Sequence, residues 1–254
     1  IGIAMGIAGT DVTKAAADMV LTDDNFASIV SAVEEGRGIY DNIRKTLQYL
    51  LAGNTGELLL MTLCVLMALP VPLLPIHLLW INLVTDGLPA LCLATDPVDS
   101  DVMQRRPRPR NERITDGGFL GKMFFTGFLT AGVAFAVYYY ALQTQGEVVA
   151  RTQAFATLVF AELLRAFGAR SDTRPVWRIP LRTNITLVLV VMVTFGLQVW
   201  SHHNTTLGLF LKTSYLSLGD CIVLLMVGAV PLLVLEGVKL WNSAARRVGA
   251  TSPT

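Results

Sequence analysis

The stretch that decides the fold is residues 51–86, which read LAGNTGELLLMTLCVLMALPVPLLPIHLLWINLVTD. Polar residues interrupt its two apolar segments at 53–57 and 82–86, and the proline-rich run 70–75 makes the turn between them. Polar and charged side chains are costly inside a membrane and usually mark the path of an ion or substrate. The stretch therefore predicts two membrane helices that carry a cation site built from oxygen ligands.

The composition of the 254-residue chain indicates a membrane protein. Hydrophobic residues make up 53% of it and charged residues 15%, whereas a soluble domain carries about 25% charged residues. The formal net charge is only +1, and the sequence has no basic stripe with interleaved aromatic residues, so nucleic acid is not an expected partner. Cys64, Cys92 and Cys221 lie in apolar segments without metal-ligand spacing, and we expect them to be small buried side chains.

Residues 1–40 differ from the rest and are typical of the tail of an α/β domain. Two short apolar runs, 1–8 and 18–21, are predicted to be buried strands, with a short helical segment at 11–18 between them. The chain begins at Ile1 without a basic segment or a signal peptide. We expect this start to lie inside a larger protein, because so few residues cannot bury a core of their own.

A helix is predicted to start near Phe26, after N-cap candidates at 22–25. It has no strong stop signal, and residues 40–49 run directly into the apolar segment. We expect a near-continuous rod from the soluble domain into the bilayer. The alternative is two helices with a hinge at 36–38, where two glycines weaken the pattern.

Six segments are candidates for membrane-spanning helices, each of which needs about 20 apolar residues. They lie at about 49–69, 76–94, 119–142, 153–168, 185–200 and 218–240. The fourth and fifth are short and are expected to extend into the interface.

Loop charge predicts the orientation of these spans, because cytoplasmic loops carry an excess of Lys and Arg. One side carries Arg105, Arg106, Arg108, Arg110, Arg113, Arg170, Arg174, Arg178, Arg182, Lys239, Arg246 and Arg247. The opposite loops carry only Arg151 and Lys212, along with His202 and His203, which we expect to be solvated. The rule is satisfied by six spans with both the N-terminal tail and the C-terminus in the cytoplasm.

The polar residues of the first two spans are spaced so that each set shares a helix face. Asn54 and Glu57 are three residues apart, and Asn82, Thr85 and Asp86 stand at i, i+3 and i+4. If these two faces meet, their oxygen atoms surround one site.

Two further features extend this constellation. Gly87 and Pro89 predict local unwinding, which a membrane tolerates only where the freed backbone lines a protein cavity. Glu162 lies in the middle of the fourth span. The candidate ligand set is then Asn54, Glu57, Asn82, Thr85, Asp86 and Glu162.

All six candidate ligands offer oxygen, which suits a hard cation such as calcium, whereas soft metals prefer Cys, Met or His. Three carboxylates exceed the charge of one divalent ion. Without the ion, like charges in a low dielectric favour protonated carboxyl groups, so protons are expected to replace the metal. This predicts cation export in exchange for protons.

A structural explanation exists for each of these residues alone. A single intramembrane Asn or Thr is more often a helix–helix hydrogen-bond partner than a ligand. A single Glu can pair with an arginine, and Arg165 lies three residues after Glu162. Three carboxylates in apolar spans are much harder to explain structurally.

Several motifs, spread over nearly the whole chain, resemble P-type ATPases. They are MG and GT within residues 5–10, LTDDNF at 21–26, VEEGR at 33–37, NTGE at 54–57 and LWINLVTDGLPA at 79–90. The sequence is most similar to calcium pumps of the sarco/endoplasmic-reticulum type and their bacterial relatives.

This resemblance implies a mainly α fold: a six-helix transmembrane bundle preceded by the tail of an α/β (HAD-like) phosphorylation domain. Residues 1–40 would be the end of that domain with the coupling helix. Residues 41–243 would be the fifth to tenth helices of a ten-helix pump, and residues 244–254 a cytoplasmic tail.

The resemblance also implies roles for individual residues. One calcium site would be formed by Asn54, Glu57, Thr85, Asp86 and Glu162, and Asn82 and Asp86 would contribute to a second. Glu57 favours the two-site calcium class over one-calcium and manganese pumps, and sodium and proton pumps differ around Asp86. Asp99 and Asp101 resemble the acidic positions of the family's coupling loop, although Gln104 replaces the third.

The family's phosphorylated aspartate, actuator loop, nucleotide domain, magnesium segment and first four helices are absent from this sequence. We therefore expect Ca²⁺ as the transported ion, with Mg²⁺ and ATP bound only by a missing N-terminal half. That half and the lipid bilayer are the expected partners, and the expected location is a bacterial plasma membrane.

Three alternatives stay open at this point. The chain could be a truncated or split module without catalysis, or part of a pump for Mn²⁺ or Na⁺. A channel or secondary transporter is the third, and it predicts inverted repeats that the sequence does not display.

Overall fold

The computed structural model describes residues 1–105, 107–109 and 113–250, with side chains up to residue 244. Two predicted loop cations, Arg106 and Arg110, lie outside the described residues, as does the end of the chain at 251–254. The side chains of Arg246 and Arg247 lie outside them too.

The first 21 residues form a small strand–helix–strand unit, as the sequence predicts. It consists of β1 (Ile3–Met5), α1 (Asp11–Ala16) and β2 (Met19–Leu21), and the two strands pair in parallel. Ala4 and Leu21 are buried, whereas Ile3 and Val20 are exposed, so the prediction of buried strands is confirmed for one residue of each strand only. The reason is that the sheet has two strands among the described residues, which leaves part of its surface uncovered.

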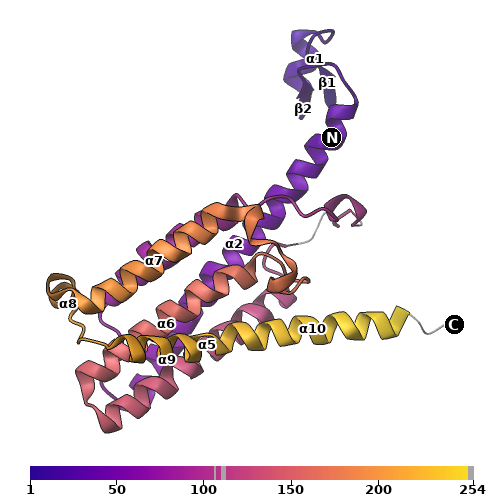
Figure 1. The fold of residues 1–254 in the computed structure, drawn as a ribbon. Helices are drawn as coiled ribbons and strands as arrows, with labels where there is room; N and C mark the ends of the chain where they lie inside the picture. The colour runs from indigo at the N-terminus through magenta and orange to yellow at the C-terminus, as the bar shows by residue number, and fades with distance from the viewer. Residues whose placement is uncertain (106, 110–112, 251–254) are drawn as a thin grey trace.

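The helix that follows, α2 (Ala27–Leu66), is continuous over 40 residues. At a rise of 1.5 Å per residue it is about 60 Å long, and it runs from the N-terminal unit deep into the helical bundle (Figure 1). Gly36 and Gly38 do not interrupt it. The rod is therefore confirmed, and the hinged alternative is not observed.

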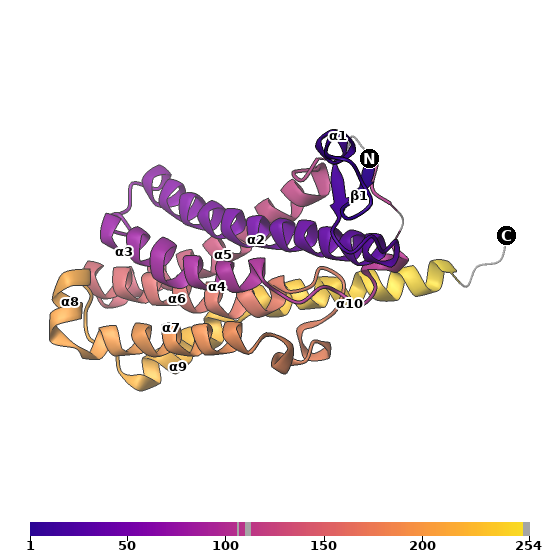
Figure 2. The ribbon, with the colours of Figure 1, turned by 90° about the horizontal axis from the view of Figure 1, so that it is seen from above.

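The remaining helices form the bundle, in which α4, α6 and α7 lie side by side (Figure 2). In chain order they are α3 (Pro75–Trp80), the π-helical segment η1 (Ile81–Asp86), α4 (Gly87–Ala94), α5 (Gly117–Thr144), α6 (Glu147–Ala169), α7 (Ile185–His203), α8 (Thr205–Leu211), α9 (Leu218–Gly228) and α10 (Val230–Ala250). Short 3₁₀ turns, at Val102–Gln104, Val176–Arg178 and Leu181–Asn184, lie in the connections.

Five helical segments among the described residues are long and apolar enough to span a membrane. They are Ala27–Leu66, Pro75–Ala94, Gly117–Thr144, Leu181–His203 and Leu218–Ala244. The predicted fourth span corresponds to α6, which is not among them. Six spans therefore stay a prediction.

The predicted last span consists of two helices that meet end to end. Helix α9 ends at Gly228, α10 begins at Val230, and Ala229 lies between them in a helical conformation. Pro231 is the physical reason for the local change, because it lacks a backbone N–H and leaves the carbonyl of Val227 without its usual helical donor. Helix α10 then continues to Ala250, so most of the segment predicted as a tail is helical.

His202 also differs from expectation. It lies in the last turn of α7 and is buried, whereas a solvated loop was predicted. Its Nε2 atom lies 3.0 Å from Gln198 Nε2, and Gln198 Oε1 accepts a hydrogen bond of 2.9 Å from Trp80 Nε1. The helix extends three residues beyond the predicted end of the span, which brings this histidine into the packed part of the bundle.

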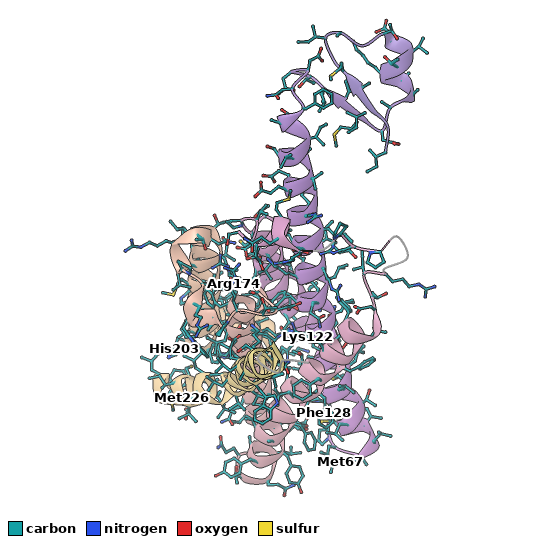
Figure 3. All side chains as sticks on the ribbon, turned by 90° about the vertical axis from the view of Figure 1, so that its right-hand side faces the viewer. Met67, Lys122, Phe128, Arg174, His203 and Met226 are labelled. Atoms are coloured by element: carbon teal, nitrogen blue, oxygen red, sulfur yellow. The ribbon has the colours of Figure 1, made fainter. Side chains whose placement is uncertain are left out.

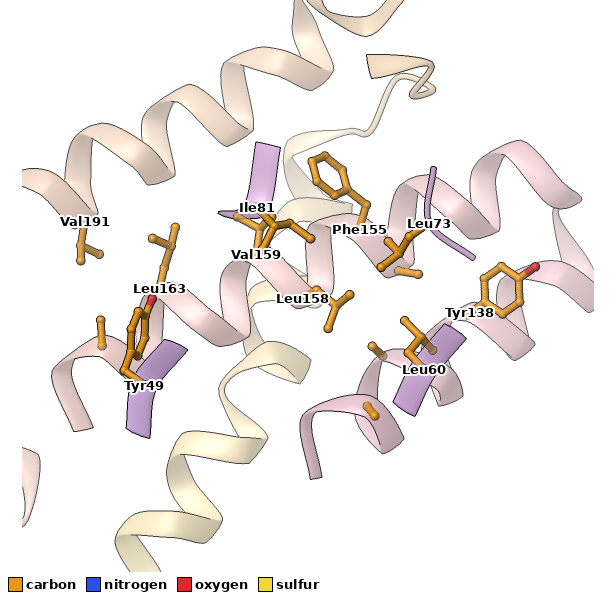
Figure 4. Close-up of a cluster of buried hydrophobic side chains, with 14 of the residues drawn as sticks. Tyr49, Leu60, Leu73, Ile81, Tyr138, Phe155, Leu158, Val159, Leu163 and Val191 are labelled. Atoms are coloured by element: carbon orange, nitrogen blue, oxygen red, sulfur yellow. The ribbon is translucent and has the colours of Figure 1, made fainter. Parts of the chain in front are cut away.

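Helix α6 is the centre of the hydrophobic core. Phe155, Leu158 and Leu163 on this helix are almost completely buried and pack among side chains from α2, α5 and η1 (Figure 4). A helix surrounded by protein can carry charged side chains that would be costly against lipid, which explains why α6 is not among the five apolar segments.

Two glycines allow α2 and α5 to approach closely. A Cβ atom at Gly127 would lie 2.7 Å from Thr55 Cγ2 and 3.1 Å from the backbone nitrogen of Gly56. A Cβ atom at Gly56 would lie 3.3 Å from the carbonyl oxygen of Gly127. Small residues at such crossings let helix backbones pack tightly in membranes.

We expect Gly127→Ala to lower the melting temperature of the protein in detergent. The added methyl group would force α5 away from α2 at a cost of about 1–3 kcal/mol, which exceeds the gain in helix propensity of about 1 kcal/mol. Gly132→Ala on the same helix is the matched control, because nothing lies within 4 Å of its Cβ position. Equal melting temperatures for the two variants would contradict the close crossing.

Candidate functional site

Three carboxylates are buried in the middle of the bundle. Glu57 comes from α2, Asp86 from η1 and Glu162 from α6, and their exposed fractions are 5%, 0% and 0%. Each has at least one oxygen that accepts no hydrogen bond from the described residues: Glu57 Oε1, Asp86 Oδ2 and both oxygens of Glu162. Buried carboxylate oxygens without a donor are costly, so this cluster is suited to protons or to a cation.

Gly53 is the point on which the cluster converges. A Cβ atom at Gly53 would lie 2.9 Å from Glu162 Oε1, 3.1 Å from Asp86 Oδ2 and 3.1 Å from Arg165 Nη2. Glu162 Oε1 and Asp86 Oδ2 therefore approach the same point beside α2. Two ionised carboxylates this close repel each other, and a proton or a cation at this point would remove that repulsion.

The other predicted ligands on α2 and η1 lie around these carboxylates. Glu57 lies near Asp86 and near the Asn82 side chain. Asn82 itself is exposed and donates to the carbonyl of Leu78 at 2.9 Å. Asn54 is half-buried, three residues before Glu57. Both amides therefore lie at the rim of the cluster.

Thr85 is fully buried beside Asp86, and its hydroxyl donates to the carbonyl of Ile81 at 2.8 Å. The hydroxyl proton is thus donated within the helix, and the lone pairs of the hydroxyl oxygen remain available to a ligand. The predicted unwinding near Pro89 takes the form of the π-helical segment η1, which ends at Asp86. The chain is widened there but not broken.

Pro89 explains part of this local geometry. It has no N–H group, so the carbonyl of Thr85, four residues earlier, loses its usual helical donor. The Tyr49 hydroxyl approaches that carbonyl oxygen at 3.4 Å, and it lies 3.4 Å from Asp86 Oδ1 and 3.3 Å from the carbonyl oxygen of Glu162. Tyr49 thus connects α2, η1 and α6 at the edge of the carboxylate cluster.

The sequence reasoning missed Tyr49 as a member of this site, although a signal was present. Tyr49, Gly53 and Glu57 are spaced at i, i+4 and i+8, which places them on one face of α2. The helix face that carries Glu57 reaches Tyr49 when it is followed two turns toward the N-terminus.

Arg165 was expected only as a possible partner of Glu162. It is buried, donates from Nη2 to the carbonyl of Tyr49 at 3.2 Å, and its guanidinium lies 5.0 Å from the centre of the Tyr49 ring. Among the residues that the structure describes, no ion pair within 4.0 Å joins Arg165 to a carboxylate. The expected direct pair with Glu162 is therefore not formed.

The cluster is not a compact metal-ligand shell. Within the described part of the chain, no group of three or more His, Cys, Asp or Glu side chains has the arrangement needed to hold a metal ion. The carboxylates surround a common region, and their oxygens would have to move together to coordinate one ion.

The loop after α4 ties the rod to the bundle through ion pairs. Asp99 pairs with Arg174, lies 3.4 Å from Arg105 and approaches Lys45 on α2 at 3.8 Å. Arg105 also pairs at 2.7 Å with Asp101 and at 2.7 Å with Asp41 on α2. The hydrogen bond from Arg105 is the main reason that the pKa of Asp101 lies below its usual value.

This ion-pair cluster lies where the rod leaves the bundle. Figure 3 shows α2 rising from the bundle toward the N-terminal unit, with Arg174 near the end of the bundle from which it emerges. Beside it, Gly38 on α2 is packed against Val98, whose side chain would clash with an added Cβ. The loop containing the two predicted coupling residues, Asp99 and Asp101, is therefore held directly against the rod.

Comparison with known proteins identifies relatives among the cation-transporting ATPases. Residues 70–241 match the family described as "Cation transporting ATPase, C-terminus". The chain is 42% identical over 239 residues to the calcium-transporting ATPase of Bacillus subtilis, covering 93% of this chain and 27% of that protein.

Two further relatives are also calcium ATPases. Identity to calcium-transporting ATPase 1 of Bacillus cereus is 40% over 256 residues, covering 94% of this chain and 29% of the relative. Identity to the endoplasmic reticulum calcium ATPase srcA of Aspergillus fumigatus is 37% over 230 residues, covering 78% of this chain and 24% of the relative. The chain thus spans less than a third of the length of each of these relatives.

We expect Gly53→Ala to weaken binding of a divalent cation about tenfold or more without unfolding the protein. The new methyl group would displace the mobile ends of Asp86, Glu162 and Arg165, whereas alanine itself favours the helix. Binding is measured as the rise in melting temperature with increasing Ca²⁺. Gly36→Ala on the same helix is the control, since nothing lies within 4 Å of its Cβ position, and equal binding by both variants would contradict the convergence at Gly53.

Proposed function

The chain belongs to the family of cation-transporting ATPase C-terminal regions, and from this premise we propose that it is the membrane cation-transport part of an ATP-driven calcium pump. In the complete pump it would carry Ca²⁺ out of the cytoplasm. The calcium-transporting ATPases to which it is similar support this proposal.

The observation that carries the proposal is the buried carboxylate cluster of Glu57, Asp86 and Glu162, with its unpartnered oxygens. Calcium takes six to eight oxygen ligands in flexible geometry. The carboxylates here do not form a compact shell. Such a cluster suits Ca²⁺ better than Mg²⁺, because Mg²⁺ demands a fixed coordination geometry. The same oxygen ligands would accept Mn²⁺ or Na⁺, so competition between these cations belongs in the test.

We assign the ligands as the resemblance implies. Asn54, Glu57, Thr85, Asp86 and Glu162 would form one calcium site, with the exposed Asn82 beside it.

Proton exchange follows from the same cluster. When the cation leaves, three carboxylates would remain in a low-dielectric environment, and the nearest oxygens of Asp86 and Glu162 approach one point beside Gly53. Protons are the simplest replacement, because they remove the buried charge and supply the missing donors. The pump would therefore return protons as it exports calcium.

Coupling would run along α2. The rod begins beside the strand–helix–strand unit, which we assign to the end of the phosphorylation domain (residues 1–40), and it continues to Glu57. The ion pairs of Asp99 and Asp101 would hold the loop to the rod as it moves. Residues 41–243 would supply the fifth to tenth membrane helices, and 244–254 a cytoplasmic end.

The N-terminal half of the pump would contribute ATP and Mg²⁺ binding and the phosphorylated aspartate. This chain would supply the ion ligands of that pump. We propose a multi-pass protein of a bacterial plasma membrane with both ends of the chain in the cytoplasm.

In the full-length pump, we expect Glu57→Gln to raise the calcium concentration needed for phosphorylation from ATP at least tenfold. The amide keeps the shape but removes a negative ligand. Glu147→Gln is the matched control, because Glu147 is half-exposed at the start of α6 and pairs with Arg151. Wild-type calcium dependence in Glu57→Gln would refute the site, and activation by Mn²⁺ or Na⁺ in preference to Ca²⁺ would reassign the cation.

Proton exchange is tested separately in sealed proteoliposomes that contain the full-length pump and a trapped pH dye. We expect the interior to become alkaline as calcium is pumped in, because protons leave in exchange. The signal should persist when a potassium ionophore collapses the membrane potential. Calcium uptake with no pH change under these conditions would rule out the exchange.

A further inference from the structure

Arg165 occupies an unusual position for a buried arginine. Its exposed fraction is 4%, and its Nε atom has no hydrogen-bond partner among the described residues. Its Nη2 atom and the nearest oxygens of Asp86 and Glu162 all lie within about 3 Å of one point beside Gly53. The guanidinium is therefore within roughly 6 Å of both carboxylates, a distance at which charges interact strongly in a protein interior.

The other buried cations of the bundle behave differently. Arg170 forms an ion pair of 3.0 Å with Asp96, and Lys239 forms one of 2.5 Å with Glu236. These are direct structural pairs. Arg165 instead donates a hydrogen bond to the backbone of Tyr49 and lies across a gap from the carboxylates. It therefore contributes positive charge to the cluster without forming a direct ion pair with a carboxylate.

This charge is permanent, because arginine stays protonated in proteins. Glu57, Asp86 and Glu162 carry three negative charges when ionised, and Arg165 lowers the net charge of the group to minus two. One divalent cation neutralises that charge. Two divalent cations would leave an excess of positive charge in a low-dielectric environment, which is costly.

We propose that Arg165 is a built-in counter-charge that limits the carboxylate cluster to one divalent cation at a time. This inference rests on the proposed function, and it revises the two-site expectation drawn from family resemblance. Arg165 acts here as a specificity-determining residue: it sets the charge that the site accepts, and it is not itself a ligand.

The first test counts the calcium ions bound by the full-length pump. Radioactive calcium is measured at saturation and divided by the number of sites that can be phosphorylated. We expect one ion per site in the wild type. Two ions would overturn the role of Arg165 while leaving the proposed function intact, whereas no calcium binding and no calcium-activated phosphorylation would overturn both.

The second test separates charge from shape. Arg165→Gln removes the charge, and at alkaline pH, where protons compete least, we expect it to bind calcium at least tenfold more tightly. Arg165→Lys keeps the charge and should stay within about threefold of the wild type. The matched control is Arg151→Gln on the same helix, which removes an arginine that pairs with Glu147, and its calcium affinity should not change.

Two outcomes of this second test would overturn the proposal. One is equal or weaker calcium binding by Arg165→Gln, and the other is an equal change in Arg165→Gln and Arg165→Lys, since either result indicates a role in packing. If Arg165→Gln does not fold, the double variant Glu162→Gln/Arg165→Gln restores the net charge of minus two. We expect that variant to fold and to bind one calcium ion, and failure to fold would also count against a role through charge.

Discussion

The structure depends on one constraint: three carboxylates have to be buried together in the middle of an apolar helical bundle. Unpaired buried charges cost several kcal/mol each, so the surrounding elements are arranged around them. Gly53 leaves room for Asp86 and Glu162 against α2. Gly56 and Gly127 bring α5 close to α2 next to Glu57. Tyr49 places its hydroxyl among η1 and α6. Each of these contacts has its effect at or within two turns of the cluster.

The same constraint bears on the proposed role of the continuous rod. In the proposed pump, the cluster would change its preferred arrangement when a cation or protons leave it. Because α2 is an unbroken helix of 40 residues, a displacement near Glu57 would be carried along its axis without a hinge to absorb it. The ion pairs that Asp41 and Lys45 form with the loop after α4 would pass that displacement to the loop. Single exposed pairs contribute little, and here several of them act on the same helix.

Sequence reasoning predicted the parts of the molecule that periodicity determines. Helical spacing placed Glu57 and Asp86 on inward faces, and the absence of a stop signal gave the rod. It failed where tertiary packing decides. At the π-helical segment that ends at Asp86, Pro89 removes a helical donor and the Tyr49 hydroxyl approaches the carbonyl of Thr85, and no local pattern contains both residues. The position of Arg165 depends on its bond to the Tyr49 backbone. His202 was misplaced because the end of α7 is fixed by its neighbours.

Helix α6 shows why hydropathy alone is a poor guide in such a bundle. It is the long bundle helix that falls outside the five apolar spans, and Glu162 and Arg165 are among the residues that make it polar. These two residues are also the ones that face the cluster. A central helix has protein on every side, so its polar groups need to match other protein groups and not lipid. The opposite charges of Glu162 and Arg165 reduce the cost of burying each other even without direct contact. The helix that looks least suited to a membrane is therefore the one whose surroundings best tolerate charge.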